Sequence, residues 1–223
     1  MINPVSQNME QIMQEIMETN RKVLKGMEIL MNMSDIDVAP TAKDLVYAED
    51  RMRLFHYKPF VKKPCPIPLL ITYALVNRQY MMDLQQDRSL IRNLLEHGQD
   101  IYIIDWGYPG PGDRYLTLDD YINGYINNAV DIVRERSKLD KINLLGVCQG
   151  GTFSVIYAAL HPEKIRNLVV MVAPVDFDTD DGLLHIWARD LPIDKMVDTL
   201  GVIPGDLMNI GFLMLRPFQL MLD

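Results

Sequence analysis

The chain has 223 residues, of which 48% are hydrophobic and 23% charged, with 13 Gly and 13 Pro, a composition typical of folded globular proteins rather than fibrous or disordered ones. Because 30 acidic residues outnumber 22 basic ones, the net charge is -8, which repels phosphate backbones and argues against nucleic acid as a partner. Only two cysteines occur, too few for a disulfide framework, so we expect a reducing, cytoplasmic location.

Residues 1–33 are predicted to form an amphipathic helix, because apolar side chains recur at intervals of three and four between Met9 and Met31. Its apolar face either packs on the same chain or, through adaptable methionines, binds another subunit or a hydrophobic body. Residues 34–43 are polar and contain Pro40, which predicts a linker. The N-terminus lacks the pattern of a signal peptide and no segment reaches 18 uncharged apolar residues, so no transmembrane segment is expected.

Residues 44–174 are predicted to form the core, because strand and helix patterns alternate as in a mainly parallel α/β sheet with helices on both faces. Apolar runs predict strands at 51–57, 69–75, 100–105, 141–147 and 166–173. Most of these runs are continuous, which predicts a sheet buried on both faces. Helices are predicted at 85–97, 117–137 and 149–160. Residues 175–223 become helical, rich in Met and Leu and broken by proline, which predicts the start of a cap.

Residues 146–150 read GVCQG and are followed by Gly151, between a predicted strand and a predicted helix. This is the spacing and the context of a nucleophile elbow, a sharp turn that presents a nucleophile at the start of a helix. The helix N-terminus favours a thiolate there, and small residues let strand and helix approach closely. We therefore predict that Cys148 is the catalytic nucleophile; a buried, inert cysteine on a tight turn is the alternative. The predicted elbow glycines are Gly146, Gly150 and Gly151.

Two backbone amides are predicted to form an oxyanion hole. The amide of Gln149 follows the nucleophile, and the amide of Val76 lies in the loop after the 69–75 strand, where this motif takes its second donor. Asn77 and Arg78 are expected to support that loop, although a plain turn is an equally good interpretation for each single residue. A thiol nucleophile forms a thioester, so exchange with a thioester substrate is nearly isoenergetic and acyl transfer is as natural as hydrolysis.

A base for this thiol is not found among the histidines. His161 ends the helix that starts beside Cys148, about 18 Å away at 1.5 Å per residue, and His185 lies in the cap. His56 and His97 precede the elbow and are interpreted as structural. Asp176 follows a predicted strand and is either an acid or a turn cap. We therefore expect the catalytic Asp and His to lie outside this chain, which would make it an inactive fragment of a longer enzyme.

Five segments together resemble polyhydroxyalkanoate synthases, most closely the short catalytic subunit of the two-component, class III type, from about Val38 onwards. They are residues 73–78 (YALVNR), 105–109 (DWGYP), 116–125 (LTLDDYINGY), 146–151 (GVCQGG) and 173–177 (APVDF). The resemblance implies an α/β-hydrolase fold, here incomplete at its C-terminus. It also implies an acyltransferase that polymerises (R)-3-hydroxyacyl-CoA, typically 3-hydroxybutyryl-CoA, with Cys148 carrying the growing chain and CoA released.

The resemblance further implies a granule-associated cytoplasmic enzyme that works with a companion subunit and as a homodimer. No cofactor is expected, because the CoA thioester is the substrate. The proline-broken loop at 107–112 lacks the spacing of a phosphate-binding glycine loop, so CoA-binding residues stay unassigned. Four scattered histidines and two cysteines predict no metal site. A cysteine hydrolase of the dienelactone-hydrolase type and a non-catalytic α/β interaction module are the alternatives.

Overall fold

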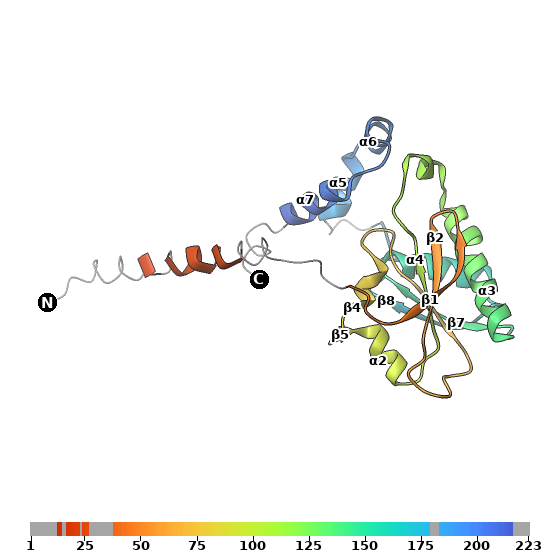
Figure 1. Cartoon of the computed structure of the whole chain (residues 1–223). Helices are drawn as coiled ribbons and strands as arrows, with labels where there is room; N and C mark the ends of the chain where they lie inside the picture. The colour runs from red at the N-terminus through yellow and green to blue at the C-terminus, as the bar shows by residue number, and fades with distance from the viewer. Residues whose placement is uncertain (1–12, 15–16, 23, 27–37, 179–182, 216–223) are drawn as a thin grey trace. The chain divides into compact units, whose positions relative to one another are not determined.

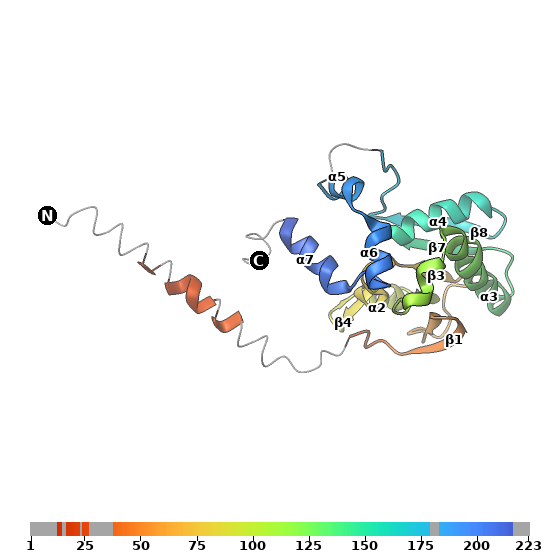
Figure 2. The same cartoon turned by 90° about the horizontal axis from the view of Figure 1, so that it is seen from above.

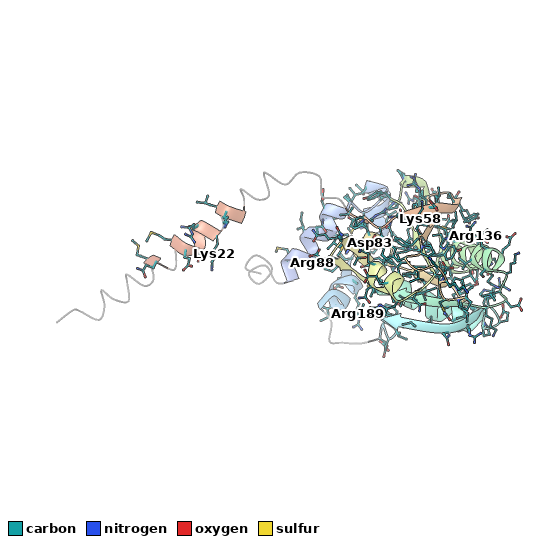
Figure 3. The ribbon with its side chains drawn as sticks, turned by 60° about the horizontal axis from the view of Figure 1, so that its bottom comes forward. Lys22, Lys58, Asp83, Arg88, Arg136 and Arg189 are labelled. Atoms are coloured by element: carbon teal, nitrogen blue, oxygen red, sulfur yellow. The ribbon has the colours of Figure 1, made fainter. Side chains whose placement is uncertain are left out.

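The structure is a computed structural model that describes residues 13–14, 17–22, 24–26, 38–178 and 183–215. The chain divides into two compact units, Met1–Val38 and Ala39–Asp223, and this boundary lies inside the predicted linker. In the first unit all the described residues before Val38 are helical, and Lys22 projects from this segment (Figure 3). The remainder of the helix predicted for residues 1–33 lies outside the described residues.

The second unit is built on a six-stranded sheet with the strand order β1-β2-β6-β3-β7-β8 (Figure 1). Strands β6, β3, β7 and β8 run parallel, whereas β1 and β2 are antiparallel at one edge. The prediction of a mainly parallel α/β sheet is therefore confirmed. The strands are β1 (Lys43–Glu49), β2 (Met52–Tyr57), β3 (Leu69–Thr72), β6 (Ile101–Asp105), β7 (Ile142–Val147) and β8 (Ile165–Met171).

Helices cover both faces of this sheet, as predicted. On one face α3 (Asn127–Ser137) and α4 (Gln149–Leu160) bury an apolar cluster that includes Leu70, Ile104 and Leu144. On the other face α2 (Leu90–Glu96) packs on a second cluster around Ile71 and Ile103. Figure 2 shows α4 beside β7 and β8, the two strands that it connects. The sheet therefore separates two cores.

The helix predicted at 85–97 begins only at Leu90, which corrects that prediction. A small hairpin of β4 (Asp83–Gln85) and β5 (Arg88–Ser89) precedes it. Ser89 caps α2, because its side chain accepts a hydrogen bond from the amide of Arg92 at 3.0 Å. Asp83 is fully buried among other side chains (Figure 3) and accepts hydrogen bonds from the amide and the hydroxyl of Thr41. These polar bonds compete with helix formation over residues 83–89.

The helix predicted at 117–137 is split. Its first part, η3 (Asp120–Ile126), is a π-helical segment that continues into α3. Such segments are rare and occur often at functional sites. A short 3-10 helix, η2 (Pro111–Tyr115), precedes it, and another, η1 (Gln79–Met82), follows the loop after β3.

The prediction that the sheet is buried on both faces holds for β3 and β6 and is wrong for β8. Only Ile165 is buried in β8, whereas Val169 and Val170 are 49% and 40% exposed. Strand β8 is the last strand in the sheet order, so its outer edge has no neighbouring strand among the described residues. Two further differences concern extents: β3 ends at Thr72 instead of residue 75, and β1 was not predicted, because its exposed residues lack a clear apolar alternation.

The segment predicted as a cap is helical, as expected. It contains α5 (Leu183–Asp190), α6 (Ile193–Leu200) and α7 (Gly205–Leu215). The side chain of Arg114 in η2 forms an ion pair with Asp198 of α6. Among the described residues, no helix is both long enough and apolar enough to cross a membrane. The predicted domain boundaries at residues 33, 43 and 174 stay predictions.

Candidate active site

Cys148 occupies the sharp turn between β7 and α4. Its backbone angles are φ 54° and ψ -128°, a conformation that costs a residue with a side chain about 1–3 kcal/mol. Cys148 is exposed to solvent, whereas Val147 before it is buried. A strained turn therefore presents the thiol outside the sheet, at the carboxyl edge of the parallel strands.

The three elbow glycines allow this turn because nothing larger fits. A Cβ atom on Gly150 would lie 2.2 Å from the carbonyl oxygen of Thr72, and one on Gly146 would lie 2.5 Å from the Cα of Gly151. A Cβ atom on Gly151 would lie 2.5 Å from the Cβ of Ala173. None of the three has a positive φ, so close approach of backbones, and not a left-handed conformation, is the reason for glycine here.

In the part of the chain that the structure describes, two amides at the first turn of α4 have no hydrogen-bond acceptor and can bind an anion. The carbonyl oxygen of Cys148 accepts hydrogen bonds from the amides of Gly151 at 2.8 Å and Thr152 at 3.3 Å. The amides of Gln149 and Gly150 lie before them and have no acceptor within the helix. Since they also lie at the positive end of the helix dipole, they can stabilise a thiolate or an oxyanion next to Cys148.

The loop after β3 comes directly against this turn. The amide of Leu75 donates a hydrogen bond to the side-chain oxygen of Gln149 at 3.1 Å. The next residue, Val76, is 47% exposed, and its amide has no acceptor in the part of the chain that the structure describes. Asn77 then turns the chain with φ 73°. Of the amides in this loop, that of Val76 is thus open to a ligand while that of Leu75 is occupied.

Arg78 holds this loop to the end of β6. Its guanidinium group lies 2.8 Å from the carboxylate of Asp105, donates to the carbonyl oxygen of Gly107 and stacks on the ring of Tyr108 at 4.1 Å. Asp105 is buried and also accepts a hydrogen bond from the amide of Gly107 at 2.9 Å. Sequence reasoning expected Arg78 to support the loop but did not identify Asp105. The sequence does contain a signal for Asp105, because it is a charged residue at the end of an otherwise apolar strand.

Tyr73 and Trp106 are two further residues at this edge that sequence reasoning did not single out. The indole nitrogen of Trp106 donates to the carbonyl oxygen of Tyr73 at 2.9 Å. Burial, and to a lesser degree the charge of Cys148, raise the pKa of Tyr73, so its phenol lies within electrostatic reach of the thiol. Tyr73 directly follows β3, and Trp106 directly follows β6. Both therefore lie at the carboxyl edge, where sites in parallel sheets form.

A hollow of about 200 Å³ opens at the same edge. Three aromatic rings in edge-to-face contact, those of Trp106, Tyr121 and Tyr125, form much of its wall. At the hollow's lining, Arg51 and Asp113 form an ion pair at 2.7 Å. The hydroxyl of Tyr125 donates a hydrogen bond to the carboxylate of Asp50 at 2.8 Å. Because these polar groups already have partners, the hollow suits a short, uncharged chain. Its remaining lining residues are Met52, Leu75, Gly107, Pro109 and Leu116.

Three of the described histidines form hydrogen bonds with residues other than Cys148. His56 bonds Asp100, and His161 at the end of α4 bonds Asn123. His97 at the end of α2 bonds the carbonyl oxygen of Asn93. His185 lies on α5, and its side chain is outside the described part of the structure.

Asp176 accepts a hydrogen bond from the amide of Asp178 at 3.0 Å, which is the turn-capping arrangement. Among the described residues, no hydrogen bond to the thiol of Cys148 is seen, and no group of three or more His, Cys, Asp or Glu is arranged to hold a metal ion.

Two family models match the chain. The alpha/beta hydrolase fold matches residues 68–221, and the N-terminus of poly-beta-hydroxybutyrate polymerase (PhaC) matches residues 3–94. The chain is 54% identical to the poly(3-hydroxyalkanoate) polymerase subunit PhaC of Allochromatium vinosum over 219 residues, which are 97% of this chain and 62% of that protein. It is also 54% identical to the subunit of the same name from Synechocystis sp., covering 95% of this chain and 58% of that protein.

Among solved structures, the chain is similar to the thioesterase domain from the curacin biosynthetic pathway. The TM-score is 0.44 with 14% sequence identity, and the match covers 66% of this chain and 50% of that one. Compared with the two PhaC subunits named above, the chain spans about three fifths of their length.

Proposed function

The chain belongs to the alpha/beta hydrolase fold family and, within it, to the PhaC polymerases, and on this premise we propose that it supplies the nucleophile of a poly(3-hydroxyalkanoate) polymerase. The substrate is an (R)-3-hydroxyacyl-CoA, typically 3-hydroxybutyryl-CoA. The reaction is acyl transfer to a growing polyester chain with release of CoA.

In the first step the sulfur of Cys148 attacks the thioester carbonyl of the substrate. A new bond forms between the carbonyl carbon and Cys148, the bond to the CoA sulfur breaks, and the thiol proton passes to CoA. In the second step the 3-hydroxyl oxygen of another hydroxyacyl group attacks the enzyme-bound thioester, an ester bond forms, the bond between the acyl carbon and the sulfur of Cys148 breaks, and the hydroxyl proton passes to the released thiolate. Both steps exchange bonds of the kind that cysteine chemistry makes easily, and neither needs a resident cofactor or metal ion.

One observation carries this proposal: Cys148 is held at φ 54° directly before α4. That conformation aims the side chain away from the sheet and beside the free amides of Gln149 and Gly150, which suits a nucleophile and would only cost energy in an inert cysteine. The open amide of Val76 supports its assignment as the second oxyanion donor. Both tetrahedral intermediates carry a negative charge on the former carbonyl oxygen, and these amides would stabilise it.

The aromatic hollow beside Leu75 supports an acyl substrate of modest size. Its volume of about 200 Å³ is below the range of pockets that hold drug-sized ligands, which suits one or two short hydroxyacyl units. Leu75, which directly precedes the proposed donor Val76, is one of its lining residues. The hollow is therefore assigned to the acyl or polyester chain and not to the charged part of CoA.

The relatives are named as polymerase subunits, which supports a companion subunit for this chain. The proposal accordingly includes a companion synthase subunit, a homodimer and a location on polyester granules in the cytoplasm. Such a protein presents its nucleophile to a water-soluble CoA thioester on one side and to an insoluble product on the other.

The test is to incubate the protein, in the full length that its gene encodes, with 3-hydroxybutyryl-CoA. CoA release together with insoluble polyester supports the proposal. CoA release with free 3-hydroxybutyrate as the sole product would instead identify a cysteine hydrolase of the dienelactone-hydrolase type. A Cys148→Ala variant that retains full activity would favour a non-catalytic module. Cys65→Ala, which removes the other free thiol, is the matched control and should remain active.

A further inference from the structure

The side chain of Gln149 joins two segments that lie far apart in the sequence. Its oxygen accepts a hydrogen bond at 3.1 Å from the amide of Leu75, which is 74 positions earlier. Gln149 is the first residue of α4, and Leu75 lies in the loop after β3. The bond is partly buried, so losing the acceptor would leave an amide without a partner in a place that water reaches poorly.

The backbone around Leu75 is fixed on two sides. On the side of β6, the indole of Trp106 binds the carbonyl oxygen of Tyr73 at 2.9 Å. On the side of α4, Gln149 binds Leu75, and Gly150 packs so tightly that a Cβ atom there would lie 2.6 Å from the oxygen of Tyr73. The segment from Tyr73 to Leu75 therefore has little freedom to shift, and this limits where the backbone of the next residue can lie.

The residue after it is Val76, whose amide is the second oxyanion donor in the proposed reaction. Its own side chain is half exposed and cannot anchor it. Arg78 holds the far end of the loop through Asp105, but Asn77 lies between with a turn at φ 73°. On the near side the hydrogen bond from Leu75 to Gln149 is thus the last fixed point before the donor.

We infer that the side chain of Gln149 is a positioning residue: it holds Leu75 so that the amide of Val76 faces the carbonyl oxygen of a thioester at Cys148. The inference rests on the proposed function. It gives one residue two separate tasks, because the backbone amide of Gln149 is itself an oxyanion donor while its side chain places the other donor. It also assigns the Leu75 amide to a structural bond, which removes it from the oxyanion hole.

The experiment compares Gln149→Met with wild type in the full-length protein. Methionine has nearly the same length and shape but cannot accept this hydrogen bond well. Gln86→Met makes the same chemical change at an exposed position in the β4–β5 turn and is the matched control. Three quantities are measured: kcat and KM for CoA release from 3-hydroxybutyryl-CoA, the rate of Cys148 alkylation by iodoacetamide, and the melting temperature.

Alkylation is the informative contrast, because the sulfur displaces iodide from the saturated carbon of iodoacetamide and no oxyanion forms. For Gln149→Met we expect kcat to fall about 10- to 100-fold, the range for a misplaced oxyanion donor, and KM to stay within about twofold, because the donor acts mainly in the transition state. The alkylation rate should match that of wild type and of Gln86→Met, while the melting temperature should fall by only a few degrees, because one partly buried amide loses its acceptor.

Other results overturn the inference. An unchanged kcat in Gln149→Met means that the side chain positions nothing. A parallel fall in kcat and in the alkylation rate means that Gln149 acts on the elbow itself and not through the loop. If wild type releases no CoA from the thioester while Cys148 is still alkylated, the proposed function fails, and this inference fails with it.

Discussion

The guanidinium group of Arg78 lies 2.8 Å from the carboxylate of Asp105, and this ion pair ties the loop after β3 to the end of β6. Asp105 is only 6% exposed, and removing one partner of a buried ion pair is strongly destabilising. The loop in question carries Val76. One ion pair at the carboxyl edge of the sheet thus couples the stability of the fold to the geometry of the proposed oxyanion hole.

Replacing Arg78 with Lys tests this coupling. Lysine keeps the charge but cannot bind Asp105 and Gly107 with one planar group, nor stack as well on Tyr108. We expect the free energy of unfolding to fall by about 1.5–3 kcal/mol, the usual value of hydrogen bonds to charged groups. Urea denaturation measures this. Arg53→Lys on the exposed side of β2 should change it by less than about 0.5 kcal/mol, and equal effects of the two substitutions would show that the ion pair contributes nothing.

Gly150→Ala should disrupt the elbow. The new methyl group would lie 2.2 Å from the oxygen of Thr72, and a backbone atom cannot move aside as a flexible side chain can. We expect a loss of about 1–3 kcal/mol in unfolding free energy from overpacking, together with a fall in CoA release. Gly124→Ala is the control, since no atom lies within 4 Å of a Cβ there; it should be neutral or stabilising. A Gly150→Ala variant as stable and active as wild type would contradict the packing described for the elbow.

Alkaline pH should destabilise the fold through its buried tyrosines. Burial raises the pKa of Tyr57, Tyr125 and Tyr157 above the ordinary value, which is about 10. Below that value both folded and unfolded states keep the phenol proton, so stability does not depend on it. Above it the unfolded chain releases protons that the folded chain retains, so the free energy of unfolding falls as pH rises.

Tyr157→Phe isolates this effect for one residue. Its hydroxyl binds the side chain of Asn127 at 3.0 Å, so at pH 8 the variant should lose about 0.5–1.5 kcal/mol, the net value of one hydrogen bond. Thermal melts between pH 8 and 11 should then show a smaller decline with pH than wild type shows. An identical decline in both proteins would exclude Tyr157 as a contributor.

The exposed edge of β8 should cause self-association of the 223-residue chain. An apolar edge strand offers unpaired backbone groups and hydrophobic side chains to another copy, and Val169 and Val170 are both well exposed. Val169→Lys should lower the apparent mass at high concentration in light scattering. Leu118→Lys, which charges an apolar residue that is 60% exposed away from β8, should leave association unchanged. If both variants associate equally, the edge is not responsible.

The sequence predicted those parts of the fold that short-range patterns encode. Helix α4 was predicted with its exact bounds, because the elbow fixes its start and the His161-Pro162 pair its end. The parallel strands were found within a few residues, since buried strands are continuous apolar runs. The hairpin before α2 was missed because Asp83 and Ser89 form polar bonds whose partners, such as Thr41, lie far away in the sequence.

The same limit applies to the site. The position of Cys148 and its glycines follows from one short motif, so the sequence located the turn. The contact between Gln149 and Leu75 depends on β3 lying next to β7, and strand order is not encoded in either segment alone. Trp106 and Asp105 join the site for the same reason, through the pairing of β3 with β6. Sequence reasoning therefore reached the nucleophile but not the residues that hold its surroundings in place.

Covalent trapping at Cys148 tests the central claim most directly. The full-length protein is mixed with 3-hydroxybutyryl-CoA, quenched in acid within the first turnover and digested, and its peptides are weighed by mass spectrometry. The account predicts one hydroxybutyryl group on the peptide that contains Cys148, sensitive to hydroxylamine as a thioester should be, present in Cys65→Ala and absent in Cys148→Ala. CoA release by wild type with no acyl group on that peptide, or undiminished CoA release by Cys148→Ala, would contradict it.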